Sequence, residues 1–110
     1  NGYKLPFATV LTCGTGSFAE DNESMSEKFF RAGTTSNPKG GVAAIGTATW
    51  NTHTLFNNIV DMGIYDGAFS KKLWYAGAAV AMGDMAIVAT YRNPNDAEEA
   101  AEWHEVWLCT

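Results

Sequence analysis

Apolar positions in the first half of the chain fall into two short runs separated by polar and turn-forming residues. The run from Phe7 to Cys13 lies between a proline and a glycine, which predicts a buried strand. A second run of small apolar residues, from Val42 to Ala48, predicts another buried strand. Strands of this kind suit a parallel sheet covered by helices. We therefore expect Phe7–Thr12 and Val42–Thr47 to be parallel neighbours, joined by a right-handed crossover.

The segment between the two predicted strands carries a helix-start signal. Ser24-Met25-Ser26-Glu27 is a capping box, in which the Ser24 hydroxyl accepts from the Glu27 amide and the Glu27 carboxylate accepts from the Ser24 amide. A helix is predicted from Met25 to about Ala32, ended by Gly33. The residues that follow, 34–41, are expected to form a turn region. The apolar face of the predicted helix consists of Met25, Phe29, Phe30 and Ala32.

The second half of the chain has the pattern of packed helices. A helix is predicted from about Leu55 to Met62. Ser70 is expected to cap a long helix that continues to Tyr91 and is apolar nearly all round, which is typical of a central helix. A strand from Met85 to Tyr91 is the alternative for its last part. Proline at the first helical position opens a last predicted helix, Asn95 to about Leu108.

Composition limits the partners of the protein. The chain has 110 residues, of which 46% are hydrophobic, so it is one globular domain or a piece of one. Its net charge of −5 and its lack of a Lys/Arg cluster argue against nucleic acid as a partner. The longest apolar stretch contains Asp84 and several small residues, so we interpret it as a buried helix and expect no membrane partner. Because the chain starts at Asn1 without an apolar leader, we expect residues 1–110 to be a segment of a longer protein.

Chemistry is most expected where Cys13 meets the glycine-rich turn Gly14-Thr15-Gly16. A thiol there is either a nucleophile at the sheet edge, where open α/β folds place their sites, or a small buried hydrophobe. A nucleophile needs a base and donors for the oxyanion. The amides of Cys13 and of this turn can act as donors. His53 follows the second strand and is either that base or an ordinary loop histidine.

Two further hypotheses concern the binding of ligands. Gly14-x-Gly16-x-x-Ala19 matches a dinucleotide fingerprint, but the predicted helix begins only at Ser24 and no acidic residue ends the second strand, so nucleotide binding is disfavoured. Trp50 lies in a loop at the expected edge of the sheet, where it is either a pocket wall or a packing residue. The cysteines and histidines lack metal-ligand spacing, so we expect neither a metal nor a cofactor.

The order of several segments resembles one known family. Lys4-Leu5-Pro6-Phe7, an apolar strand and then Cys13-Gly14-Thr15-Gly16-Ser17-Phe18 resemble the nucleophile segment of the gingipain family of cysteine peptidases. The resemblance covers nearly the whole chain. Its further matches, in order, are Ser26-Glu27-Lys28-Phe29-Phe30-Arg31-Ala32-Gly33, Gly41-Val42-Ala43-Ala44-Ile45-Gly46-Thr47-Ala48, Ser70 to Met82, and Trp103-His104-Glu105-Val106-Trp107-Leu108.

The resemblance implies a caspase-like α/β fold, with a mostly parallel sheet flanked by helices, of which residues 1–110 form the C-terminal part. It implies a cysteine endopeptidase, a thiol protease that is secreted or on the cell surface and acts on polypeptide substrates. Cys13 is then the catalytic nucleophile, and Cys13 and Gly14 form the oxyanion turn. The loop that contains Thr49, Trp50 and His53 is the wall of the substrate pocket.

The chain departs from the family pattern in one respect that matters for activity. The family's catalytic histidine lies in a Gly-His-Gly type motif upstream of the cysteine, and residues 1–110 contain no such motif. We therefore expect the base to come from the missing N-terminal half of the domain, on the same or a companion chain. The isolated segment is expected to be inactive. The alternative is a non-catalytic binding or structural domain that keeps the caspase-like fold.

Overall fold

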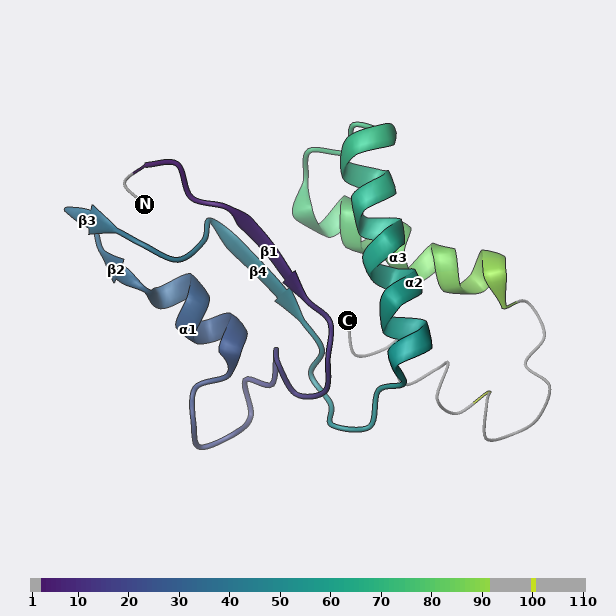
Figure 1. The fold of residues 1–110 in the computed structure, drawn as a ribbon, viewed down its shortest axis with the longest axis horizontal. Coiled ribbons are helices and arrows are strands. Elements are labelled where there is room, and N and C mark those ends of the chain that lie inside the picture. The colour runs from purple at the N-terminus through teal and green to yellow at the C-terminus, as the bar shows by residue number, and fades with distance from the viewer. Residues whose placement is uncertain (1–2, 92–99, 101–110) are drawn as a thin grey trace. The chain divides into compact units, whose positions relative to one another are not determined.

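The chain divides into two compact units. The computed structural model describes residues 3–91 and residue 100. Unit 1 is Asn1–Trp50 and unit 2 is Asn51–Thr110. Strands and one helix build unit 1, whereas the described residues of unit 2 form helices (Figure 1).

A parallel pair of strands is the centre of unit 1. β1 (Phe7–Val10) pairs with β4 (Ala43–Gly46) in a register that runs from Phe7↔Ala43 to Val10↔Gly46. This confirms the predicted parallel arrangement, but both strands are shorter than predicted. β1 ends at Val10 because the Thr12 N–H donates back to the Val10 carbonyl at 3.1 Å, a tight turn that interrupts the extended backbone. Cys13 consequently lies in the turn after the strand.

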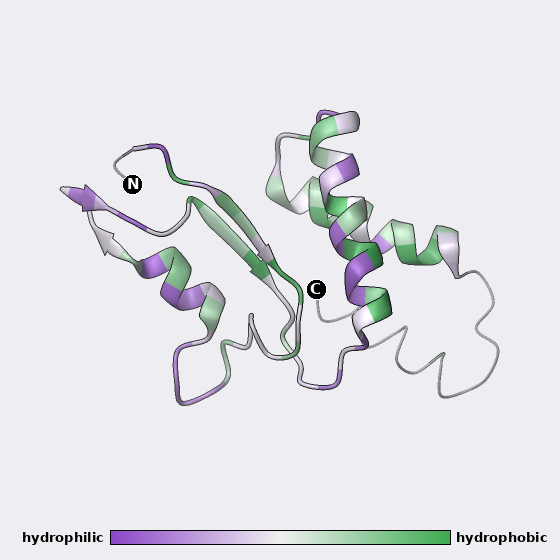
Figure 2. Ribbon diagram, viewed as in Figure 1, coloured by the Kyte–Doolittle hydropathy of each residue, from purple (hydrophilic) through white to green (hydrophobic). Residues whose placement is uncertain are grey.

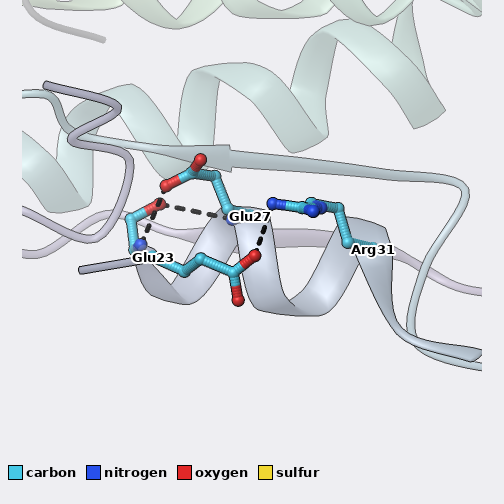
Figure 3. A network of polar contacts seen from close by, with 4 residues as sticks. Glu23, Glu27 and Arg31 are labelled. Carbon is cyan, nitrogen blue, oxygen red and sulfur yellow. Dashed lines mark hydrogen bonds and ion pairs between the residues drawn. The ribbon is translucent and has the colours of Figure 1, made fainter. Parts of the chain in front are cut away.

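The capping box at the start of α1 (Met25–Arg31) forms as predicted. The Ser24 hydroxyl accepts from the Glu27 N–H at 3.3 Å, and a Glu27 carboxylate oxygen accepts from the Ser24 N–H at 2.9 Å (Figure 3). Arg31 in the last turn forms an ion pair with Glu23. Because both side chains of that pair are largely exposed, the capping box contributes more to the stability of the helix than the ion pair does.

The predicted apolar face of α1 is only partly buried. Met25 and Phe30 are 56% and 62% exposed. The helix stays beside β4 because Gly41, just before the strand, donates its N–H to the Phe29 carbonyl at 3.2 Å. Between helix and strand, the predicted turn region contains a short antiparallel hairpin of β2 (Gly33–Thr34) and β3 (Asn37–Pro38). Figure 2 shows the mixed polarity of α1 next to the apolar β4.

Two helices that cross closely build unit 2. α2 (Thr54–Tyr65) extends beyond the predicted end at Met62, and α3 is Ala76–Thr90. A Cβ built on Gly63 would lie 2.7 Å from the Cα of Gly83, so the two backbones touch at this crossing. The side chains buried on the two helices recur every four residues, which gives each helix one apolar stripe. The most buried apolar residues here are Phe56, Val60, Ile64, Ala79 and Ile87.

The connection between these helices differs from the prediction. A short π-helix, η1 (Asp66–Ser70), continues from α2, so Ser70 ends a helix and does not cap the next one. Lys72 then adopts a positive φ of 57°, and Tyr75 is the residue before α3. Residues 85–90 are helical, and the alternative of a strand there is wrong.

α3 was expected to be buried nearly all round, but only one of its faces is buried, because Met85 is 57% exposed. Within residues 3–91, no helix is both long and apolar enough to cross a membrane. The predicted helix from Asn95 to Leu108, together with Cys109, lies outside the described residues.

Candidate functional site

The turn that carries Cys13 is held by two buried threonine side chains. The Thr15 hydroxyl donates to the Thr12 carbonyl at 2.8 Å and is also in contact with the Val10 carbonyl. The hydroxyl of Thr47, the residue after β4, donates to the same Thr12 carbonyl. Thr15 and Thr47 are both buried, so these bonds are shielded from water. The backbone on each side of Cys13 is therefore fixed.

Backbone hydrogen bonds join this turn to the segment after β4. The Gly14 N–H donates to the Thr49 carbonyl at 2.6 Å, and the Gly16 N–H donates to the Thr47 carbonyl at 2.9 Å. The two backbones approach so closely that a Cβ on Gly16 would lie 2.7 Å from the carbonyl group of Gly46. The carboxyl ends of both strands thus meet at one edge of the sheet, as their parallel direction predicts.

Trp50 covers the turn from one side. A Cβ on Gly14, whose φ is +69°, would lie 2.9 Å from Cε2 of the indole. The indole Nε1–H donates to Glu20 Oε1 at 3.0 Å. Cys13, Gly14, Glu20 and Trp50 line one cavity of about 340 Å³. The structure therefore brings three of the predicted site residues, Cys13, Gly14 and Trp50, to the same hollow.

Most of the residues that line the cavity around Cys13 are polar, although apolar atoms make up the larger part of its surface. Cys13 itself is half-buried. The carboxylates of Glu20 and Glu23 both line the cavity, and they already accept from Trp50 and Arg31 respectively. The remaining lining residues are Thr15, Ser17, Asn22, Ser24 and Met25. A substrate group that enters here meets an indole face and many hydrogen-bonding groups beside the thiol.

The amides of the turn are largely used within the chain. In this structure the Gly14 N–H, predicted as an oxyanion donor, is bonded to the Thr49 carbonyl, so it does not face the cavity as a ready donor. The Thr15 N–H likewise donates to the Thr12 carbonyl at 3.2 Å. The role of the Cys13 amide as a donor stays a prediction. Thr49 contributes to the site through its carbonyl, which anchors Gly14.

His53 belongs to unit 2, where it caps α2. Its Nδ1 accepts from the Leu55 N–H at 3.2 Å, and its ring is tilted against Phe56 with the centroids 5.6 Å apart. This role was not predicted from the sequence, although His53 stands two residues before the predicted start of the helix at Leu55. Its place in the substrate pocket stays a prediction.

Two other features escaped the sequence analysis. Glu20 was not recognised as the partner of Trp50, because thirty positions separate the two side chains and no local pattern links them. A second cavity of about 430 Å³ lies between α1 and β4, bounded by Phe18, Phe30 and Ala43 among others, and the buried Ser26 beside it has a hydroxyl without a hydrogen-bond partner in the described part of the chain. Across residues 3–91, no cluster of His, Cys, Asp or Glu side chains could hold a metal ion.

Comparison with protein families shows the family to which this chain belongs. Residues 1–109 match the family described as peptidase family C25. The chain belongs to this family, the gingipain family. Membership confirms the resemblance seen in the sequence and supports, in general terms, a cysteine peptidase domain and therefore a hydrolase. Comparisons with curated proteins and with solved structures give no match.

For a gingipain-family chain, the fold has the expected general character. The described residues form a mixed α/β arrangement with a small parallel sheet and helices, and the family implies a caspase-like fold. Cys13 is the cysteine among the described residues, and it lies at the edge of the sheet where both parallel strands end. This is the edge at which parallel α/β sheets commonly carry their sites.

Proposed function

We propose that this gingipain-family chain supplies the nucleophile of a cysteine endopeptidase and that Cys13 is that nucleophile. The supporting observation is the cavity that Cys13 shares with Trp50, beside a turn fixed by buried hydrogen bonds. A fixed turn holds the sulfur in one position relative to a bound carbonyl, and such orientation lowers the barrier to attack. Thr49, Trp50 and His53 are proposed to form the wall that receives the substrate residue before the scissile bond.

The reaction has two steps. The Cys13 thiolate attacks the carbonyl carbon of a peptide bond and gives a tetrahedral oxyanion. The C–N bond then breaks, the amine leaves with a proton donated by the protonated base, and a thioester remains. Water attacks the thioester as it loses a proton to the same base, the carbon–sulfur bond breaks to release the acid, and the Cys13 thiolate and the protonated base are restored. No cofactor or metal enters this sequence.

The base is proposed to come from a polypeptide segment outside residues 1–110, on the same or a companion chain. Between residues 3 and 50 the chain has no histidine, and the Nδ1 atom of His53 is already engaged as the cap of α2. An imidazolium beside Cys13 would favour the thiolate, which is the nucleophilic form of the side chain. On this proposal, residues 1–110 alone hydrolyse peptides poorly, and the complementing segment restores the reaction.

The test uses the longest natural polypeptide that contains these residues. It is incubated with a peptide that carries an acyloxymethyl ketone, and the labelled residue is identified by peptide mapping. Selective labelling of Cys13 over Cys109, together with loss of peptide hydrolysis in Cys13→Ala, is the expected result. If both cysteines label equally, or if Cys13→Ala still hydrolyses peptides, the proposal fails and a non-catalytic binding domain becomes the better description.

A further inference from the structure

A hydrogen bond links two side chains that line the Cys13 cavity. The indole Nε1–H is the only hydrogen-bond donor of the Trp50 side chain, and it points to Glu20 Oε1 at 3.0 Å. Glu20 lies in the loop between the Cys13 turn and α1, and both Glu20 and Trp50 line the cavity. This bond therefore ties together two walls that are distant in sequence.

The tie matters because packing alone holds Trp50 weakly. The Trp50 side chain is 62% exposed, whereas tryptophan side chains in proteins are on average highly buried, so few packing contacts hold this one in place. At its base the residue is fixed, since the Thr49 carbonyl before it accepts from the Gly14 N–H. At its far end the ring is held by Glu20, and the absence of a side chain on Gly14 leaves the space into which the ring fits.

We propose that Glu20 is a positioning residue of this site, which holds the indole of Trp50 against Gly14 and so sets the width of the cavity at Cys13. The inference rests on the proposed function for its catalytic meaning. The hydrogen bond itself does not depend on that function. Glu20 acts on the substrate through Trp50 and takes no part in bond making or breaking.

Loss of the bond releases the ring to other rotamers. A bulky reagent then reaches the Cys13 sulfur more easily, whereas a small reagent gains little, because the turn that carries the thiol keeps its own hydrogen bonds. For a peptide substrate, the misplaced wall weakens binding in the ground and transition states alike. KM therefore rises about threefold, the effect of losing one exposed hydrogen bond, while kcat changes little.

The test measures alkylation of Cys13 in the longest natural polypeptide, with iodoacetamide as the small reagent and a fluorescein maleimide as the bulky one. Rates come from mass-spectrometric peptide mapping, and the rates at Cys109 serve as the internal reference. In Glu20→Ala, the rate of alkylation of Cys13 by the bulky reagent, divided by its rate with the small reagent, is expected to rise about threefold. In Glu20→Gln, whose side-chain oxygen still accepts from the indole, the ratio stays at the parental value.

Two controls separate the bond from other effects. Asp21→Asn removes a neighbouring charge without touching Trp50, and it should leave the ratio unchanged. Trp50→Phe removes the indole donor and should raise the ratio, and Glu20→Ala added to Trp50→Phe should change nothing more. The inference is overturned if the alkylation ratio of Glu20→Ala equals that of the parent, or if the ratio of Asp21→Asn equals that of Glu20→Ala. It is also overturned if the effects of Glu20→Ala and Trp50→Phe on the ratio are simply additive in the double variant.

These outcomes are distinguishable from failure of the proposed function, because alkylation requires no turnover. A ratio that responds to Glu20 in a protein without peptidase activity supports the role of Glu20 in holding the wall and rejects the proposed function. If peptide hydrolysis depends on Cys13 but Glu20→Ala changes neither the alkylation ratio nor KM, the proposed function is supported and the positioning role is rejected.

Discussion

Replacing Asp84 by asparagine tests the packing of unit 2 most directly. Asp84 lies on α3 directly after Gly83, the residue at which the helices cross. Its Oδ1 atom is buried and has no hydrogen-bond partner in the described part of the chain. Burial raises the pKa of this carboxyl from 3.8 to about 6. A carboxylate without a partner is costly there, whereas a neutral amide of the same shape is not charged at any ordinary pH.

The size and the sign of the effect follow from this shift in pKa. A shift of about two units corresponds to roughly 3 kcal/mol, and because the side chain is only half-buried, solvent screening reduces the expected value to about 1 kcal/mol. Between pH 3.8 and about 6 the folded state keeps the Asp84 proton while the unfolded state releases it. The free energy of unfolding therefore falls as pH rises through this window, and the full penalty applies above about pH 6.

The assay is urea unfolding of the chain, followed by far-ultraviolet circular dichroism between about pH 4 and pH 8. Asp84→Asn is expected to raise the free energy of unfolding by about 1 kcal/mol at neutral pH and to reduce its fall between pH 4 and pH 6. Asp66→Asn, at an exposed position, is the matched control and should keep the parental profile. The reasoning is refuted if Asp84→Asn is no more stable than the parent at neutral pH, or if its profile has the parental slope.

Three further predictions concern backbone and capping. Ser24→Ala should lower the free energy of unfolding by about 1 kcal/mol, measured by urea titration, and Ser24→Thr should recover most of it. Gly14→Ala should cost about 1–2 kcal/mol and shift Trp50, because its φ is +69° and its Cβ would meet the ring; unchanged stability and an unchanged alkylation ratio at Cys13 would contradict this. Gly83→Ala should lower the melting temperature because a Cβ there would lie 2.7 Å from backbone, whereas Gly77→Ala, with nothing within 4 Å, should not; equal melting temperatures would count against the close crossing.

The sequence predicted the features that local chemistry determines. The capping box at Ser24 and Glu27 depends on residues within one helical turn, so its pattern indicated the start of α1 directly. The parallel pairing of β1 with β4 followed from two apolar strands joined by a helix. The family resemblance added the choice of Cys13, which the residue pattern alone had left open between a nucleophile and a packing residue.

Longer-range contacts explain where the prediction differed. β1 stops at Val10 because the following turn is held by Thr15 and by Thr47, and Thr47 follows the other strand, β4. α2 continues past its predicted end at Met62, and Gly63 in its interior is explained by the crossing with α3, where a Cβ would lie 2.7 Å from the Cα of Gly83. The bond from Trp50 to Glu20 has no local signature at all. Each of these features depends on a partner that the sequence does not place.

The attachment of the Cys13 turn to β4 bears on how such a site can diverge. Backbone groups make two of the bonds that join them, from Gly14 and Gly16 to the carbonyls of Thr49 and Thr47. Carbonyl oxygens are present whatever the side chain, so most side chains after β4 can be exchanged without moving the thiol. The constraint falls instead on the two glycines and on the buried hydroxyls. A lineage can therefore remodel what the cavity accepts while its reactive atom stays in place.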